Sequence, residues 1–164
     1  MLVGIVSDTH DNGEIVEQAV QLFDQAGVDA VVHCGDIVAP FSATPFEDAG
    51  FDFYAVRGNN DGEWALQNVV DDFGTYLGEM GELTFDGQAF AVYHGTSEPI
   101  VEALLDCGAY DYVCRGHTHE RVHEQRGETT HINPGGISIP PALGAPAAVV
   151  VDTDTGDVEF HDLG

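Results

Sequence analysis

The chain contains no lysine, and its 164 residues include only four arginines against 29 aspartates and glutamates, a formal net charge of −25. A surface with so little positive charge repels the phosphate backbone of nucleic acids and the anionic face of membranes. Because 43 % of the residues are hydrophobic, the charge does not indicate disorder. The sequence predicts one folded domain over residues 1–164 and disfavours nucleic acid and membrane as partners.

Cysteines and long hydrophobic runs are also scarce. Three cysteines without a CxxC pair exclude a disulfide framework and favour a reducing compartment. The first apolar run stops at Ser7 and Asp8 and has no basic residues before it, unlike a signal peptide. The longest later apolar stretch, Ala142–Val151, has ten residues, far below the ~18 of a membrane span. We therefore expect a cytoplasmic protein.

The acidic residues are spread along the whole chain and form no tail. Such a chain repels itself at ordinary ionic strength, whereas at about 1 M salt the Debye length falls to about 3 Å and the repulsion is screened. We interpret the charge as that of a halophile's protein, which works in a high-salt cytoplasm. The alternative is an ordinary acidic protein, but acidity alone does not require the absence of lysine.

Hydrophobic periodicity predicts strands that alternate with helices in the first half of the chain and short strands in the second. The expected strands are 2–6, 29–34, 52–57, 75–77, 82–85, 88–93, 111–115, 121–125, 129–132, 147–152 and 158–161, and the expected helices are 11–26, 41–49 and 99–107. Asp11 and Glu14 resemble a capping box, and Gly27 ends the first helix. The order indicates βαβ units, and with the later strands it predicts an α/β sandwich of two packed sheets with helices outside.

Five short polar motifs follow predicted strands. They are Ser7-Asp8-Thr9-His10, Cys34-Gly35-Asp36, Arg57-Gly58-Asn59-Asn60-Asp61, His94-Gly95-Thr96 and Arg115-Gly116-His117-Thr118-His119. Ligands of open α/β sheets gather at the carboxyl ends of strands, so these motifs can converge on one crevice. Their imidazoles and carboxylates suit two divalent transition metals and need no thiolate. We expect extended backbone in Asp8-x-His10 and His117-x-His119, which would turn both side chains of each pair to one side.

These motifs resemble those of the calcineurin-like metallophosphoesterases, in particular the compact single-domain phosphodiesterases of bacteria and archaea. The resemblance runs from Leu2 to about Val151 and includes Ile132-Asn133-Pro134-Gly135. It implies a four-layer α-β-β-α sandwich with two mixed sheets. It also implies one metal at Asp8, His10, Asp36 and His119 and a second at Asp36, Asn59, His94 and His117, with Asp36 bridging. Mn²⁺ is the expected ion, and Ni²⁺, Fe²⁺ and Zn²⁺ are alternatives.

The function implied by this resemblance is hydrolysis of a small-molecule phosphodiester by a hydroxide that bridges two metals. A phosphomonoesterase or a nuclease could use the same centre. A non-catalytic scaffold, like the retromer subunit with this fold, is a further alternative, but every ligand position is filled here. The family also makes a homodimer an expectation.

The chain departs from the family at Asn60, where many members have a histidine that protonates the leaving group or stabilises the phosphoryl group. An amide can donate a hydrogen bond but cannot act as a general acid. We therefore expect Asn60 to be a catalytic residue that provides no proton, so that the enzyme hydrolyses only esters with good leaving groups. Asp61 would pair with that histidine; here it either caps the following helix or orients Asn59.

Several residues near the motifs have two readings. Arg57 and Arg115 are either a clamp for the substrate phosphate or counter-charges for nearby carboxylates, and both readings stay open. Four histidines outside the motifs are predicted to be structural or surface residues: His33, His123, His131 and His161. For Phe41 and Trp64 we favour packing in the core over lining the crevice.

Overall fold

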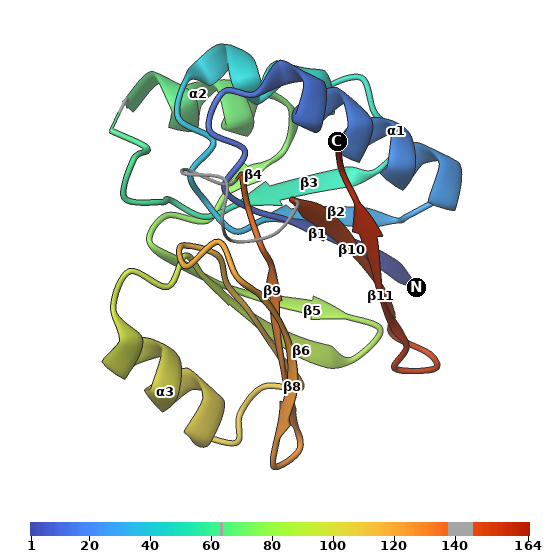
Figure 1. Cartoon of the computed structure of the whole chain (residues 1–164), viewed down its shortest axis with the longest axis vertical. Helices are drawn as coiled ribbons and strands as arrows, with labels where there is room; N and C mark the ends of the chain where they lie inside the picture. Colours follow the sequence, from blue (N-terminus) through green and yellow to red (C-terminus); the bar gives the residue numbers. More distant parts are fainter. Residues whose placement is uncertain (63, 138–145) are drawn as a thin grey trace.

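The computed structural model describes residues 1–62, 64–137 and 146–164, so the first part of the apolar stretch 142–151 lies outside the described residues. One sheet has the strand order β11-β10-β1-β2-β3-β4 (Figure 1). Its strands are β1 (Leu2–Val6), β2 (Ala30–His33), β3 (Asp52–Ala55), β4 (Thr75–Tyr76), β10 (Ala147–Asp152) and β11 (Val158–Asp162). β1 to β4 pair in parallel, and β10 and β11 pair antiparallel.

The second sheet has the order β5-β6-β7-β9-β8. Its strands are β5 (Met80–Phe85), β6 (Gln88–Tyr93), β7 (Tyr112–Cys114), β8 (Arg121–Arg126) and β9 (Thr129–Pro134). β6, β7 and β9 are parallel, whereas β5 and β8 run antiparallel to their neighbours. Both sheets are therefore mixed, as predicted.

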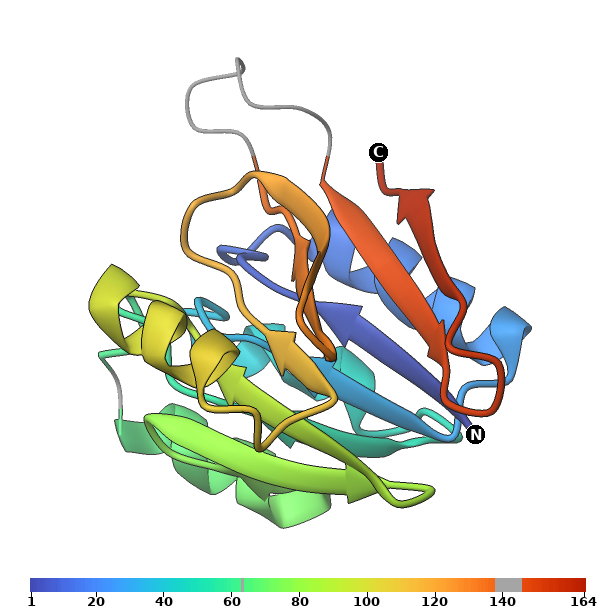
Figure 2. The same ribbon diagram turned by 90° about the horizontal axis from the view of Figure 1, so that it is seen from below.

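Alternation along the strands divides the core into three layers. Val3 and Val32 of the first sheet face Phe90 and Ile132 of the second, and these belong to one buried cluster between the sheets. A second cluster lies between the first sheet and the helices α1 (Gly13–Ala26) and α2 (Trp64–Phe73), and a third between the second sheet and α3 (Glu98–Asp106). Figures 1 and 2 show α1 and α2 on one side and α3 on the other. The four-layer sandwich is confirmed.

The cap of α1 differs from the prediction by one residue. The side chain of Asn12, and not that of Asp11, accepts the amide hydrogen of Ile15. Asp11 Oδ1 instead accepts hydrogen bonds from Ala39 N (2.8 Å) and Ser42 Oγ (2.6 Å). Gly27 ends the helix at φ +67°, as expected of a left-handed C-terminal glycine.

The predicted helix over 41–49 is wrong. Two short 3₁₀ helices, η1 (Pro40–Ser42) and η2 (Thr44–Phe46), take its place. Pro45 lacks an amide hydrogen, so an α-helical bond cannot form in the middle of this segment. Conversely, the bounds of α2 were not predicted, although a helix was assumed after Asp61; α2 buries Leu66 and Val70, one turn apart, against the first sheet.

The exposed aromatic residues correct a further expectation. Trp64 is 80 % exposed and Phe41 is 67 % exposed, so neither packs in the core. Among the described residues, no helix combines the length and the apolarity that crossing a membrane requires.

Candidate metal centre

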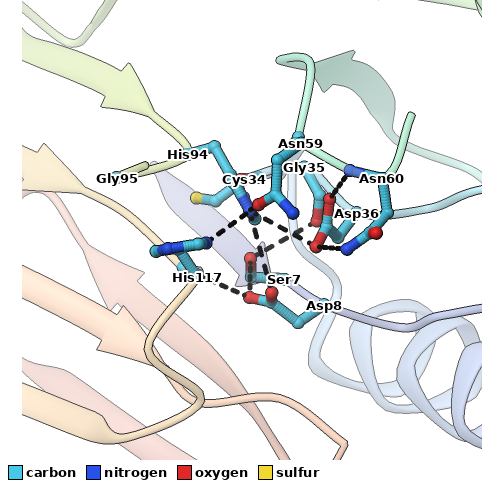
Figure 3. Close-up of polar contacts among 12 residues, drawn as sticks. Ser7, Asp8, Cys34, Gly35, Asp36, Asn59, Asn60, His94, Gly95 and His117 are labelled. Carbon is cyan, nitrogen blue, oxygen red and sulfur yellow. Dashed lines mark hydrogen bonds and ion pairs between the residues drawn. The ribbon is translucent and has the colours of Figure 1, made fainter. Parts of the chain in front are cut away.

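The loops that follow β1, β2, β3, β6 and β7 converge at one edge of the sandwich and carry the five motifs (Figure 3). Contacts join all seven of the predicted ligands: Asp8, His10, Asp36, Asn59, His94, His117 and His119. Two groups among them have ligand atoms close enough to share an ion: Asp8 with His10 and His119, and Asp8 with Asp36 and His94.

Asp8 is fully buried, and its two carboxylate oxygens have different surroundings. Oδ2 accepts hydrogen bonds from Ser7 Oγ (2.5 Å) and from the amide of His117 (3.0 Å). Within the described part of the chain, Oδ1 has no hydrogen-bond partner, and neither has His10 Nε2, 3.8 Å away. Buried polar atoms without partners are rare, so the chemistry of this pair fits a cation-binding role.

His94 and His119 have the same arrangement of ring nitrogens. His94 Nδ1 lies 2.8 Å from the carbonyl oxygen of Cys34, and His119 Nδ1 lies 2.5 Å from that of Ile137. A carbonyl oxygen only accepts, so each Nδ1 carries the hydrogen, and each neutral ring has a lone pair on Nε2. These lone pairs face Asp36 Oδ2 (3.4 Å) and Asp8 Oδ1 (3.3 Å). Only a proton or a metal ion makes such facing lone pairs favourable.

The pKa directions agree with this demand for positive charge. Burial lowers the pKa of His94, but the nearby carboxylates of Asp36 and Asp8 favour the protonated ring, outweigh burial and raise the pKa overall. The contact with the Asp8 carboxylate likewise raises the pKa of His119. Burial raises the pKa of Asp36, but contacts with His94 and Asn60 outweigh it and bring the pKa to about 2.

Asn59 lies between two histidines. Its Oδ1 is 3.0 Å from His94 Nε2 and 2.9 Å from His117 Nδ1 (Figure 3). Asp36 Oδ2 is 3.5 Å from His10 Nε2, so Asp36 lies between His10 on one side and His94 on the other. That Asp36 bridges two metals stays a prediction.

The backbone of the motifs is not extended, contrary to the prediction. Five predicted ligands have φ between +44° and +70°: Asp8, His10, Asp36, His117 and His119. Residues with side chains adopt this left-handed region infrequently, and functional sites are enriched in such conformations. The loops turn sharply after each strand, and these turns direct the side chains into the crevice.

Two glycines allow the loops to approach one another. A Cβ on Gly58 would overlap the carboxylate of Asp36, and a Cβ on Gly116 would overlap Ser7 and Asp8. The motif glycines therefore stand where one ligand loop passes against the next.

Asn60 contacts a predicted ligand directly. Its amide nitrogen donates to Asp36 Oδ1 and its side-chain Nδ2 donates to Asp36 Oδ2, both at 2.8 Å (Figure 3). The side chain thus orients Asp36.

The arginines next to the motifs pair with carboxylates of the protein. Arg115 is 4 % exposed; its Nη1 lies 2.9 Å from Glu98 Oε2, and its Nη2 donates to the carbonyl of Gly95 (3.0 Å). Arg57 is more exposed and lies 3.1 Å from Glu79 Oε1. These contacts favour the counter-charge interpretation, most strongly for Arg115.

Two residues, Ser7 and His33, support the site without having been predicted to do so, and Asp61 supports it through contacts that were not predicted. Ser7 donates to Asp8, and its place directly before the ligand was the available signal. Buried His33 accepts the amide hydrogen of Gly35 at Nδ1 (3.2 Å), and its Nε2 lies 3.1 Å from Thr9 Oγ1. The sequence offered Asp61 as a helix cap or as a residue that orients Asn59; its carboxylate accepts backbone hydrogen bonds from Asp36, Val38 and Gly58.

Comparison with known proteins adds independent evidence. Residues 1–156 match the calcineurin-like phosphoesterase superfamily domain. The chain is 37 % identical to phosphodiesterase MJ0936 of Methanocaldococcus jannaschii over 145 residues, which cover 82 % of this chain and 83 % of the relative. It is 31 % identical to phosphodiesterase YfcE of Escherichia coli, over 94 % of this chain and 89 % of the relative. A solved structure of an archaeal phosphodiesterase superimposes with a TM-score of 0.92 at 33 % identity, covering 99 % of this chain and all of that one.

Proposed function

Since the chain belongs to the calcineurin-like phosphoesterase superfamily and its relatives include proteins named phosphodiesterases, we propose that it is a metal-dependent phosphodiesterase for small molecules. The single observation that carries the proposal is the pair of buried, unpartnered atoms Asp8 Oδ1 and His10 Nε2, set among lone pairs that face one another. A protein that used this crevice only as a docking surface would gain nothing from that arrangement.

Two divalent ions fit the ligand sets. Asp8, His10, Asp36 and His119 would hold one, and Asp36, Asn59, His94 and His117 would hold the other, with Asp36 shared. Imidazole, carboxylate and amide oxygen suit Mn²⁺, our first choice, and also Ni²⁺, Fe²⁺ or Zn²⁺. Cys34 is buried in the core and burial raises the pKa of its thiol, so it offers no thiolate. When bound, two such ions supply Lewis-acid activation of water and neutralise phosphoryl charge.

The chain's own groups define the substrate. Asn60 can donate a hydrogen bond but cannot protonate a leaving alkoxide, so the enzyme depends on leaving groups that depart as anions. Through its two hydrogen bonds to Asp36, Asn60 also orients the proposed bridging ligand. We therefore expect activity on aryl phosphodiesters and little on alkyl diesters.

A nuclease on the same centre is disfavoured by the arginines. All four lie within 3.1 Å of a carboxylate oxygen: Arg57 of Glu79, Arg115 of Glu98, Arg121 of Asp162 and Arg126 of Glu102. With no lysine in the sequence, these pairs do not form a basic track for a phosphate backbone. We propose a small substrate for this reason.

The test combines metal content with a substrate panel. The purified protein, loaded with Mn²⁺ in concentrated KCl, is given bis(para-nitrophenyl) phosphate, para-nitrophenyl phosphate and an alkyl diester, with mass spectrometry of bound metal alongside. We expect about two ions per chain and turnover of the aryl diester above all. Faster turnover of the monoester would favour a phosphomonoesterase, and absence of both metal and turnover would favour a scaffold.

A further inference from the structure

Asp61 is a buried carboxylate that belongs to neither proposed ligand set. It is 3 % exposed, and within the described residues its side chain accepts three hydrogen bonds, all from backbone amides. Oδ2 accepts from Asp36 N and Gly58 N, both at 2.8 Å, and Oδ1 accepts from Val38 N at 2.7 Å. A carboxylate with several amide donors is a strong acceptor, because charge-assisted bonds exceed neutral ones.

The three amides come from two different loops. Asp36 and Val38 lie in the loop after β2, and Gly58 lies in the loop after β3. The first loop carries Asp36, and the second carries Asn59 directly after Gly58. The side chain of Asp61 therefore connects the loop that carries Asp36, the proposed shared ligand, to the loop that carries Asn59, a proposed ligand of the second ion only.

The loop after β2 has an unfavourable backbone conformation that contacts from elsewhere in the protein must stabilise. Asp36 has φ +59° and Val38 has φ +86°, and a β-branched residue in this region is a marked outlier. Such conformations persist where surrounding contacts over-determine them. Asp61 accepts the amide hydrogens of both residues, so it contributes directly to that hold.

Asp61 is itself fixed by its own turn. Its amide donates to the carbonyl of Gly58 (3.3 Å), and its carbonyl accepts from Arg57 Nε (3.1 Å). These bonds orient the Asp61 carboxylate from the loop after β3 toward the loop after β2. Arg57, for which the sequence left a substrate clamp and a counter-charge open, thus supports this turn.

We propose that Asp61 is a positioning residue that sets the affinity of the centre for metal by fixing Asp36 and Asn59 relative to each other. The inference rests on the proposed function, since it assumes that these two residues are ligands. Partners that orient metal ligands typically change metal affinity about 10–100-fold when they are removed. A residue that only stabilised the fold would change the melting temperature and leave the affinity of the folded protein unaltered.

Two variants give a graded test. Asp61→Asn keeps one acceptor oxygen, so it retains the hydrogen bonds at one carboxylate position. At the other position its side-chain NH₂ group faces a backbone N–H and cannot accept from it. Asp61→Ala removes all three bonds. The matched control is Asp29→Asn, because Asp29 Oδ2 also accepts a backbone hydrogen bond between loop and strand (Leu2 N, 2.8 Å), yet it precedes β2 at the opposite end from the crevice.

The experiment measures Mn²⁺ binding by isothermal titration calorimetry and thermal unfolding in EDTA for each variant. We expect Kd for Mn²⁺ to rise about 10-fold in Asp61→Asn and about 100-fold in Asp61→Ala, with Asp29→Asn unchanged. If Asp61→Ala fails to fold, Asp61→Asn carries the test. A folded Asp61→Asn with wild-type Kd overturns the inference, as does a loss of folding in both variants, which would make the role purely structural. Absence of Mn²⁺ binding by the wild type would instead refute the proposed function itself.

Discussion

Carboxylates occupy two kinds of place in this protein, the crevice and the outer surface, and they are held differently in the two. Asp8, Asp36 and Asp61 are buried, and backbone amides or side chains bond to most of their oxygens. Glu17 and Glu128 are exposed, like most of the acidic residues. The comparison teaches that carboxylates have two functions here. In the crevice, where they are buried, the orientation of each carboxylate matters, whereas on the surface the carboxylates act together through their total charge.

The largest expected difference is between removal of one carboxylate from each region. Asp36→Ala removes the group between His10 and His94, and we expect kcat on the aryl diester to fall by about 10³-fold or more, because a single lost stabilising group in an active site already costs 10²–10³-fold. Glu17→Gln, the exposed control, should keep activity within about 2-fold and stability within about 0.5 kcal/mol. Equal activity of the two variants would refute the distinction between crevice and surface carboxylates.

Salt tests the surface carboxylates together. We expect the melting temperature to rise by roughly 10 °C between about 0.1 M and about 3 M KCl, since screening removes self-repulsion worth a few kcal/mol. The measurement is circular dichroism in EDTA, with NaCl as a second salt. Equal melting temperatures at both concentrations would contradict the proposal that the protein works in a high-salt cytoplasm.

Asn60→His tests the departure from the family. A histidine can supply the proton that an amide cannot, so hydrolysis of an alkyl diester should rise by about 10²-fold while hydrolysis of the aryl diester changes little. The measurement is the dependence of kcat/KM on leaving-group pKa, which should flatten in the variant. If the wild type already hydrolyses alkyl and aryl diesters at equal rates, another group protonates the leaving oxygen.

The smallest effect concerns His33, beneath two of the ligand loops. Burial lowers its pKa to about 3, so it stays neutral in the folded protein, whereas unfolding restores a pKa near 6.5. Its contribution to stability is therefore complete above pH 6.5 and is lost as the pH falls from there toward 3. His33→Gln should reduce the pH dependence of the unfolding free energy by up to about 1.4 kcal/mol per pH unit in that window. Urea unfolding in EDTA measures this slope, with the half-buried His161→Gln as the control; an unchanged slope would contradict the assignment.

The prediction from the sequence was strongest where burial repeats at a local period. The strands around Val3 and Val32 were found because apolar residues alternate or run together, and the helix after Asn12 because they recur every three to four residues. It failed where a single residue overrides the period: Pro45 breaks the segment that was expected to be helical. That residues 1–164 form one domain stays a prediction.

The sequence by itself determined which chemical groups the crevice contains, because motif order and strand ends can be read along the chain. Only the tertiary structure decided how those groups are held. Asp61 meets the amide of Asp36 across 25 positions of sequence, and Asp8 meets that of His117 across 109. Such contacts depend on how loops from different strands and both sheets pack, and no local pattern encodes that packing. The same dependence made Asp8, His10 and His117 left-handed where an extended backbone was expected.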